Sequence, residues 1–255
     1  MVTIKPVFAL SLLAGLITPG LSAAVKINAF GDSITGSPVQ FFHLLIGIQG
    51  CWRALLYQKL IEAGVTDIDF VGTLPAQGCG IEYDGENDGH GGFLATGIVA
   101  DNQLPGWLAI SQPDIVMMQI ATNDVWSNIA TATILDAYST LVDQMRDSKS
   151  TMHIVVAQIT PMNPTNGCAT CEAGIIALND AIPAWAAEKS TTESPITVVD
   201  CYTGYDTATD TYDGVHPNDS GNVKLADAWF EPLQAAISAT SSGTNATLTK
   251  RSRMA

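Results

Sequence analysis

The 255-residue chain has few basic residues, with 11 Lys and Arg against 25 Asp and Glu. Nucleic-acid binding requires clustered basic side chains that displace counterions from phosphates, so we expect no nucleic-acid partner. Stable association with anionic membranes is disfavoured for the same reason. The chain also lacks long repeats and the heptads of a coiled coil. Its apolar content of 47% excludes a disordered chain and is typical of one globular domain, which we expect to be a monomer.

No run of about 20 apolar residues, the length needed to span a bilayer, is present. The apolar run 7–17 follows Lys5 and precedes the small residues Ser22, Ala23 and Ala24, a pattern that predicts a secretory signal peptide over residues 1–24. Residues 238–255 are rich in Ser and Thr without apolar periodicity, which predicts a disordered tail. The catalytic domain is therefore predicted over residues 25–237, in a secreted, extracellular protein.

Five cysteines in a secreted chain are expected to form disulfides, because the compartment is oxidising. Cys168 and Cys171 have the spacing of a redox or zinc motif, but no second such pair and no suitably spaced His follows. We therefore predict no metal site, a local disulfide between Cys168 and Cys171, a second one between Cys51 and Cys79, and a buried free thiol at Cys201.

Continuous apolar runs alternate with amphipathic segments through the middle of the chain. The runs are rich in β-branched residues and predict strands buried on both faces of a parallel sheet, at 25–30, 68–71, 115–120, 154–159 and 196–199. The amphipathic segments predict helices at 51–63, 96–109, 131–147, 172–188 and 219–237. This alternation indicates an α/β fold, a three-layer α/β/α sandwich with a five-stranded parallel sheet, whose active crevice lies beyond the carboxyl ends of the strands.

Two polar clusters follow predicted strands directly, residues 31–34 (GDSI) and 122–124 (TND), and a third, residues 213–218 (DGVHPN), comes after the last predicted strand. Acyl transfer needs a nucleophile, a base and a group that orients the base. Of the four histidines, His216 alone follows a carboxylate, Asp213, by three residues. Taken alone, Ser33 could be a loop hydroxyl or a helix cap, and the Asp213–His216 pair could be a solvated turn before a helix. Together they predict that Ser33 is a nucleophile, His216 its base and Asp213 the orienting carboxylate.

The remaining three histidines lie in less suitable places. His43 belongs to an apolar segment, His153 begins a predicted strand and His90 lies in a glycine-rich loop, where we expect it to form loop hydrogen bonds. Among aromatic residues near the strand ends, Trp107, Trp126 and Tyr212 could stack on sugar rings, although packing in the core is the simpler role for most of them.

The chain resembles the SGNH (GDSL-type) hydrolases in four ordered blocks: FGDSITG at 30–36, GHGG at 89–92, TND at 122–124 and YDGVHPNDSGN at 212–222. It is similar in particular to carbohydrate esterase family 3, which includes fungal acetylxylan esterases. The resemblance implies a flavodoxin-like fold and an oxyanion hole made by the backbone amides of Ser33 and Gly92 and the side-chain amide of Asn123. Gly91 is an alternative to Gly92, and Asn123 has an alternative role as a strand-end cap.

Two features depart from the family pattern. Ala121 stands where the third block usually begins with Gly, and its methyl group would press on the backbone beside the substrate. The apolar segment VQFFHLLIGIQ, residues 39–49, interrupts the passage to GCWRALL. It is either an apolar flap favouring lipidic substrates or a translated intron remnant; we favour the remnant, because an exposed apolar patch promotes aggregation.

The leading hypothesis is a secreted serine esterase that deacetylates O-acetylated plant cell-wall polysaccharide, through an acyl-enzyme on Ser33 and without a cofactor. A second hypothesis keeps the same residues but assigns lipid or other short-chain esters as substrates. A third, of another class, is a non-catalytic carbohydrate-binding protein on a hydrolase scaffold, which the presence of Ser33, Asn123, Asp213 and His216 disfavours.

Overall fold

The computed structural model describes residues 23–36, 51–163 and 167–252. The predicted signal peptide, apart from its last two residues, and the 39–49 segment lie outside the described residues.

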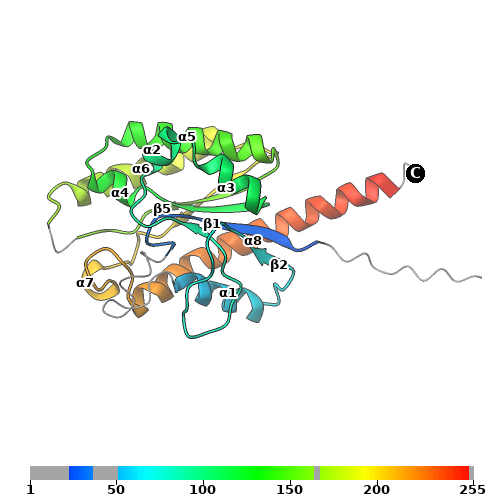
Figure 1. The fold of residues 1–255 in the computed structure, drawn as a ribbon, viewed down its shortest axis with the longest axis horizontal. Helices are drawn as coiled ribbons and strands as arrows, with labels where there is room; N and C mark the ends of the chain where they lie inside the picture. Colours follow the sequence, from blue (N-terminus) through cyan, green and yellow to red (C-terminus); the bar gives the residue numbers. More distant parts are fainter. Residues whose placement is uncertain (1–22, 37–50, 164–166, 253–255) are drawn as a thin grey trace, which may run out of the picture.

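The five predicted strands form one parallel sheet (Figure 1). They are β1 (Val25–Gly31), β2 (Ile68–Phe70), β4 (Ile115–Gln119), β5 (His153–Gln158) and β6 (Ile196–Asp200), in the spatial order β2-β1-β4-β5-β6. A further short strand that the sequence pattern does not predict, β3 (Asp88–Gly89), pairs in parallel with the end of β1. Strand β2 lies on one side of β1, and β4, β5 and β6 follow on the other side, so the switch point of the sheet lies between β1 and β4.

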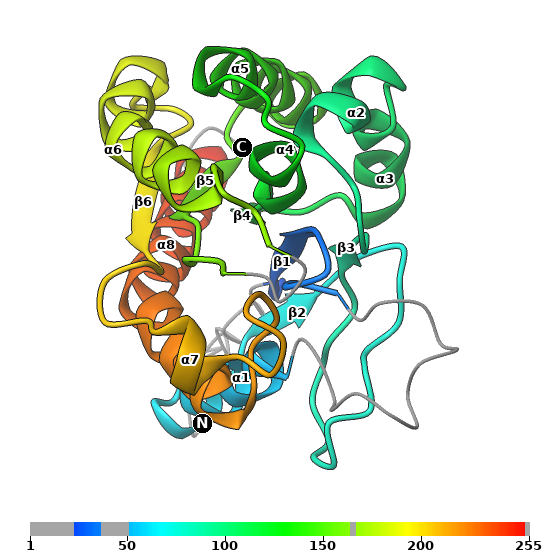
Figure 2. The same cartoon turned by 90° about the vertical axis from the view of Figure 1, so that its left-hand side faces the viewer.

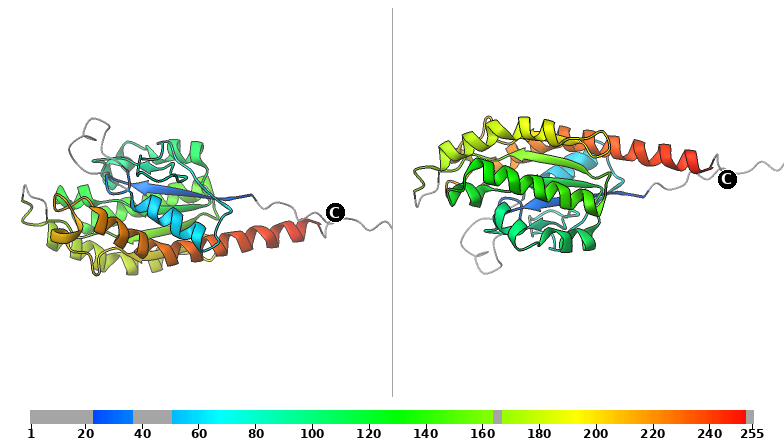
Figure 3. Two further views of the ribbon diagram at one scale, coloured as in Figure 1. Left: turned by 90° about the horizontal axis from the view of Figure 1, so that it is seen from below. Right: turned by 90° about the horizontal axis from the view of Figure 1, so that it is seen from above.

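Helices cover both faces of the sheet, as the continuous apolar strands predicted (Figures 1 and 3). One face carries α1 (Trp52–Glu62) and α8 (Asp219–Ser252). The other carries α2 (Ala95–Ala100), α3 (Leu104–Ser111), α4 (Thr122–Trp126), α5 (Thr131–Ser148) and α6 (Cys171–Lys189). Neighbouring residues of β4 alternate between the two cores: Val116 and Met118 pack on the second face, Ile115 and Met117 on the first. The result is the predicted three-layer sandwich.

The segment predicted as one helix at 96–109 forms two, α2 and α3. Between them Asn102 has a left-handed backbone with φ of 50°, which interrupts the helix. Pro105 lies in the first turn of α3, where its missing N–H leaves no helical hydrogen bond unmade.

The end of the chain differs from the expected disordered tail, because α8 continues past residue 237 to Ser252. Figure 1 shows this end of the helix extending beyond the sheet. The hydroxyls of Ser238, Ser241 and Ser242 donate to carbonyls four residues earlier in the helix. Such bonds satisfy the hydroxyls inside a helix, so a Ser/Thr-rich composition did not by itself end α8.

Both predicted disulfides are present. Cys51, which precedes α1, is joined to Cys79 across 28 positions of sequence, and Cys168 is joined to Cys171 across three. Cys201, after β6, is a buried free thiol, and its burial raises the pKa of the thiol. Among the described residues, no helix is both long and apolar enough to cross a membrane.

Candidate active site

The nucleophile loop, residues 32–36, follows β1 at the carboxyl edge of the sheet. The Asp32 carbonyl accepts the N–H groups of Thr35 (3.2 Å) and Gly36 (2.9 Å), and its carboxylate accepts that of Ile34 (3.0 Å). These three bonds close a tight turn around Ser33. The local sequence therefore fixes the position from which the Ser33 hydroxyl projects.

Two side chains in the first turn of α1 donate hydrogen bonds to the backbone of the nucleophile loop. The indole N–H of Trp52 donates to the Ile34 carbonyl (2.8 Å), and Nε of Arg53 donates to the Thr35 carbonyl (2.9 Å). Arg53 is fully buried and also donates to the Gly85 carbonyl (2.8 Å). Burial lowers the pKa of this guanidinium to about 10, which leaves it charged at neutral pH. Sequence reasoning missed both residues, because nothing local distinguishes them from helix core residues.

Three predicted residues form one hydrogen-bonded line. Ser33 Oγ lies 2.8 Å from His216 Nε2, and His216 Nδ1 lies 2.6 Å from Asp213 Oδ2. When Nδ1–H donates to the carboxylate, Nε2 is left to accept the hydroxyl proton of Ser33. The structure thus brings together Ser33 and His216, which are 183 positions apart in sequence.

The Asp213 carboxylate is held in its ionised form. Partial burial alone would raise the pKa of Asp213, but the hydrogen bonds from the side chain and backbone of His216 and from the Val215 N–H outweigh it. The pKa therefore lies below its usual value. An ionised carboxylate at this position stabilises the imidazolium that forms when His216 takes up a proton.

Asp213 and His216 lie in a closed hairpin. The Tyr212 N–H donates to the His216 carbonyl (3.2 Å), and Thr211 and Pro217 form an isolated antiparallel bridge. The hairpin runs from α7 (Thr207–Asp210) to the start of α8. The carboxylate and imidazole are thus positioned by contacts within a few residues.

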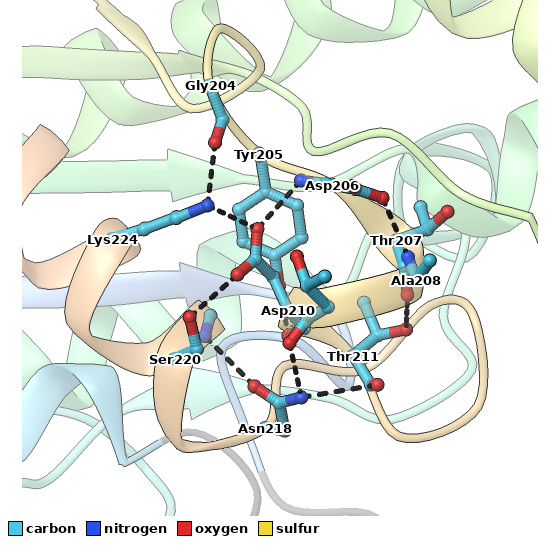
Figure 4. A network of polar contacts seen from close by, with 12 residues as sticks. Gly204, Tyr205, Asp206, Thr207, Ala208, Asp210, Thr211, Asn218, Ser220 and Lys224 are labelled. Atoms are coloured by element: carbon cyan, nitrogen blue, oxygen red, sulfur yellow. Dashed lines mark hydrogen bonds and ion pairs between the residues drawn. The ribbon is translucent and has the colours of Figure 1, made fainter.

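The buried carboxylate of Asp210 anchors both ends of this hairpin (Figure 4). It accepts the Asp206 N–H (2.7 Å), the Ser220 hydroxyl (2.7 Å) and the Lys224 ammonium (2.6 Å). The Asp210 carbonyl accepts the Asn218 N–H (2.9 Å). Because Ser220 and Lys224 belong to α8, Asp210 fixes the last turn of α7 against the helix that follows His216.

Strand β3 places the glycine-rich loop beside the nucleophile loop. Gly89 lies opposite Gly31 in the sheet register. A Cβ on Gly36 would collide with the Gly89 carbonyl, so the two backbones approach to a distance that only glycine allows.

The glycine-rich loop then turns sharply at Gly92. The Phe93 N–H donates to the His90 carbonyl (3.1 Å), and Gly92 has φ of 83° at the third position of this turn. That conformation favours glycine. Within the described residues, neither the N–H of Gly92 nor that of Ser33 donates a hydrogen bond, so both remain available to a ligand.

Asn123 supplies a third potential donor. It lies in α4, directly after β4, and its side-chain Nδ2 donates to the Phe93 carbonyl (3.0 Å). This bond uses one of the two amide hydrogens and fixes the orientation of the group, which leaves the second hydrogen free. The bond also links α4 to the residue after Gly92.

Asp124, which sequence reasoning grouped with Asn123 without giving it a role, makes a second link between these segments. Its fully buried carboxylate accepts the N–H groups of Ala95 (2.7 Å) and Thr96 (3.0 Å) and the Thr96 hydroxyl (2.7 Å). These groups begin α2, three and four residues after Gly92. Consecutive residues of α4 therefore hold the segment that carries the Gly92 amide.

A group of buried polar side chains lies at the ends of β1 and β4. Asp32, Thr35, Gln119 and Thr122 are all nearly or fully buried. Burial raises the pKa of the Asp32 carboxyl, although the hydrogen bond from the Ile34 N–H opposes this effect. The nucleophile turn thus rests on buried polar side chains, a feature with no sequence signal.

Ala121, the departure from the family pattern, adopts a left-handed backbone conformation, which glycine adopts without steric cost. Its φ is 97° and its side chain is fully buried. This conformation is sterically strained in any residue that has a Cβ atom. The strain therefore lies in the backbone of Ala121, two residues before Asn123.

The other candidate aromatic and histidine residues divide between core and surface. His90 stacks on Trp107 with 3.9 Å between ring centroids, and its Nε2 lies 3.8 Å from Asp88, too far for a hydrogen bond. The ring of Tyr212 lies nearly parallel to that of His216, with 5.9 Å between centroids. Trp126, by contrast, is 39% exposed.

All three polar clusters lie at the switch point, where an open parallel sheet forms its binding crevice. In Figure 2 this edge faces the viewer, with α4 above the end of β1 and α7 below it. A serine hydroxyl, an imidazole and a carboxylate in hydrogen-bonded sequence form the arrangement used by serine hydrolases.

The chain belongs to the GDSL-like lipase/acylhydrolase family, whose model matches residues 29–224. It is accordingly an esterase or acylhydrolase.

Within this family it is similar to carbohydrate esterases of family 3. The identity to one from Talaromyces cellulolyticus is 30%, with a TM-score of 0.72, over 84% of this chain and 98% of that one. The identity to one from Clostridium thermocellum is 26%, with a TM-score of 0.69, over 85% and 99%. An acetyl esterase variant solved with an acetate ion gives 30% and 0.72, over 84% and 98%.

Among curated proteins, the chain is similar to a multidomain esterase of Ruminococcus flavefaciens, with 28% identity over 243 residues. The match covers 87% of this chain but only 30% of that relative.

Proposed function

We propose that this chain is a secreted serine esterase that removes acetyl groups from O-acetylated plant cell-wall polysaccharide. The observation that carries the proposal is the line from Ser33 through His216 to Asp213, which lies beside unengaged backbone and side-chain donors. Similarity to an acetyl esterase bound to acetate and to family 3 carbohydrate esterases supports the choice of an acetyl group on a sugar.

The reaction begins when His216 Nε2 takes the hydroxyl proton of Ser33 as Oγ attacks the ester carbonyl. A C–O bond forms, and the carbonyl oxygen becomes an oxyanion. When the tetrahedral intermediate collapses, the imidazolium gives its proton to the departing sugar hydroxyl. Water then attacks the acyl-enzyme by the same route, releases acetate and regenerates Ser33.

The oxyanion would accept hydrogen bonds from the backbone N–H groups of Ser33 and Gly92 and from the free amide hydrogen of Asn123. Loss of one such donor typically slows a reaction about 10²–10³-fold. Gly92 is preferred over Gly91 for this role, because its positive φ and the adjacent Asn123–Phe93 bond fix its amide relative to Asn123.

Secretion is part of the proposal, supported by the composition of residues 1–24 and by two disulfides. N-terminal sequencing of the protein recovered from culture medium tests it. A first residue near Val25 is expected, and retention of Met1 on a cell-associated protein would contradict it. Peptide mapping of the same sample decides whether residues 39–49 are present.

The activity is tested by acetate release from acetylated xylan, compared with hydrolysis of a glyceride, for the wild type and Ser33→Ala. We expect acetate release by the wild type and a loss of at least about 10³-fold in Ser33→Ala. Glyceride hydrolysis alone would instead support a lipid esterase. Activity that survived Ser33→Ala would refute the mechanism, and a wild type inactive on every ester would indicate a binding protein.

A further inference from the structure

Trp126 is the most exposed of the five tryptophans in the chain. Trp52 and Trp229 are buried and stacked on each other, Trp107 stacks on His90, and the indole N–H of Trp185 donates to Ser139. Trp126 is 39% exposed, and within the described residues its ring makes neither a hydrogen bond nor an aromatic contact. The ring is therefore free to bind a ligand.

The geometry of α4 places Trp126 on the same side of the helix as Asn123. Thr122, Asp124 and Val125 are buried at 4%, 0% and 3% exposure, so they define the inner side of the helix. At about 100° per residue, Asn123 and Trp126 share the remaining side, about 60° apart. Long side chains in helices lean toward the N-terminus, which places the indole over the turn containing Asn123.

The helix that presents Trp126 is held rigidly. Val125 packs so closely on α6 that a Cβ on Gly174 would lie 2.8 Å from its Cγ1. The Asp124 carboxylate bonds to the start of α2, and its carbonyl accepts the Ile129 N–H (3.0 Å). A flat side chain on a fixed helix loses little conformational freedom when it binds a ligand.

We propose that Trp126 forms a sugar subsite, in which the indole face stacks on the apolar face of a pyranose ring next to the acetylated unit. This inference rests on the proposed function and adds to it a residue that selects oligosaccharide over small esters. An alkyl chain would need a continuous apolar groove. The other exposed large apolar side chains among the described residues are Ile110, Ile176 and Val223, each on a different helix, whereas a sugar ring needs only one flat aromatic surface.

The test compares wild type, Trp126→Ala and Trp126→Phe on acetylated xylo-oligosaccharides and on p-nitrophenyl acetate. We expect Trp126→Ala to lower the ratio of kcat/KM for oligosaccharide to kcat/KM for p-nitrophenyl acetate about tenfold, chiefly through KM for the oligosaccharide. Trp126→Phe should restore most of the ratio, because it keeps an aromatic face. Ile110→Ala, a change at a side chain that is 71% exposed on α3, is the control and should leave the ratio unchanged.

The outcomes separate this inference from the proposed function. If the wild type releases acetate from oligosaccharides and Trp126→Ala leaves the ratio unchanged, the subsite is refuted while the esterase proposal stands. Equal losses on both substrates would also refute it, since they would indicate a structural role. A wild type that cleaves p-nitrophenyl acetate but no acetylated oligosaccharide would overturn both. A higher KM of Trp126→Ala for p-nitrophenyl octanoate, without an effect on the oligosaccharide, would assign the ring to an acyl chain and refute the sugar subsite.

Discussion

The two disulfides should contribute very unequally to stability, because they close loops of very different length. The bond between Cys51 and Cys79 joins the start of α1 to the segment between β2 and β3. The residues after Cys51 are Trp52 and Arg53, which bind the nucleophile loop. The bond between Cys168 and Cys171 closes a single turn before α6.

The expected magnitudes follow from the lengths of the closed loops. A cross-link removes entropy from the unfolded chain by a constant amount plus an amount that rises with the logarithm of the loop length. For the 28-position loop this amounts to about 3.5 kcal/mol, and for the three-position loop to about 1.5 kcal/mol. In a domain of this size, the corresponding losses in Tm are about 7–14 °C and about 3–6 °C.

The assay is urea unfolding, followed by tryptophan fluorescence, of two double variants, Cys51→Ala/Cys79→Ala and Cys168→Ala/Cys171→Ala. Removing both partners leaves no new free thiol, and Ala is used because a hydroxyl at the buried Cys171 would add a desolvation cost. Equal losses in the free energy of unfolding, or a larger loss from the short loop, would refute the argument from loop length.

Three further results are expected. Ala121→Gly should cost about 1–2 kcal/mol less in stability than Ala157→Gly, because of the two alanines only Ala121 has a strained φ, 97°. Ala157, a buried alanine in strand β5, serves as the control. Equal losses in the free energy of unfolding in urea would contradict this. Asp124→Asn should lower kcat for p-nitrophenyl acetate at least about tenfold with little change in KM, because the charged carboxylate that holds the segment carrying the Gly92 amide is lost. A change confined to KM would argue against a positioning role for Asp124. Burial lowers the pKa of His153 below 6.5, so the unfolded chain binds the proton more readily and stability declines as the pH falls below that value. His153→Gln should therefore flatten the dependence of the unfolding free energy on pH between about pH 7 and 5, and an unchanged slope would exclude this contribution.

The strands and the Ser33–His216–Asp213 line were predictable because their signals are local. The run at 115–118 has apolar side chains at successive positions, and only a strand with both faces covered can bury Ile115 and Val116 together. The position of Ser33 after the first predicted strand and the spacing of Asp213 and His216 were sufficient to expect a common site, because parallel strands end at one edge.

The supporting contacts were not predictable, because their partners are distant in sequence. Strand β3 is two residues long, and its Asp88 accepts a bond from Asn28 (2.6 Å), 60 positions away. No periodic pattern marks such a pair. The buried Arg53 likewise binds only acceptors outside its own helix, and composition cannot show them. The extension of α8 to Ser252 is not predictable from composition, because Ser and Thr hydroxyls can bond to carbonyls within a helix as well as to water in a disordered tail.

The late position of the α7–α8 hairpin in the chain determines when the candidate active site is completed during synthesis. Asp213 and His216 meet as soon as their own hairpin closes, but Ser33 must wait for a partner 183 positions further along the chain. Every strand of the sheet leaves the ribosome before His216 does. A nascent chain whose sheet has already folded therefore carries an unpaired serine and no ester-cleaving centre, and activity is among the last properties that the growing polypeptide acquires.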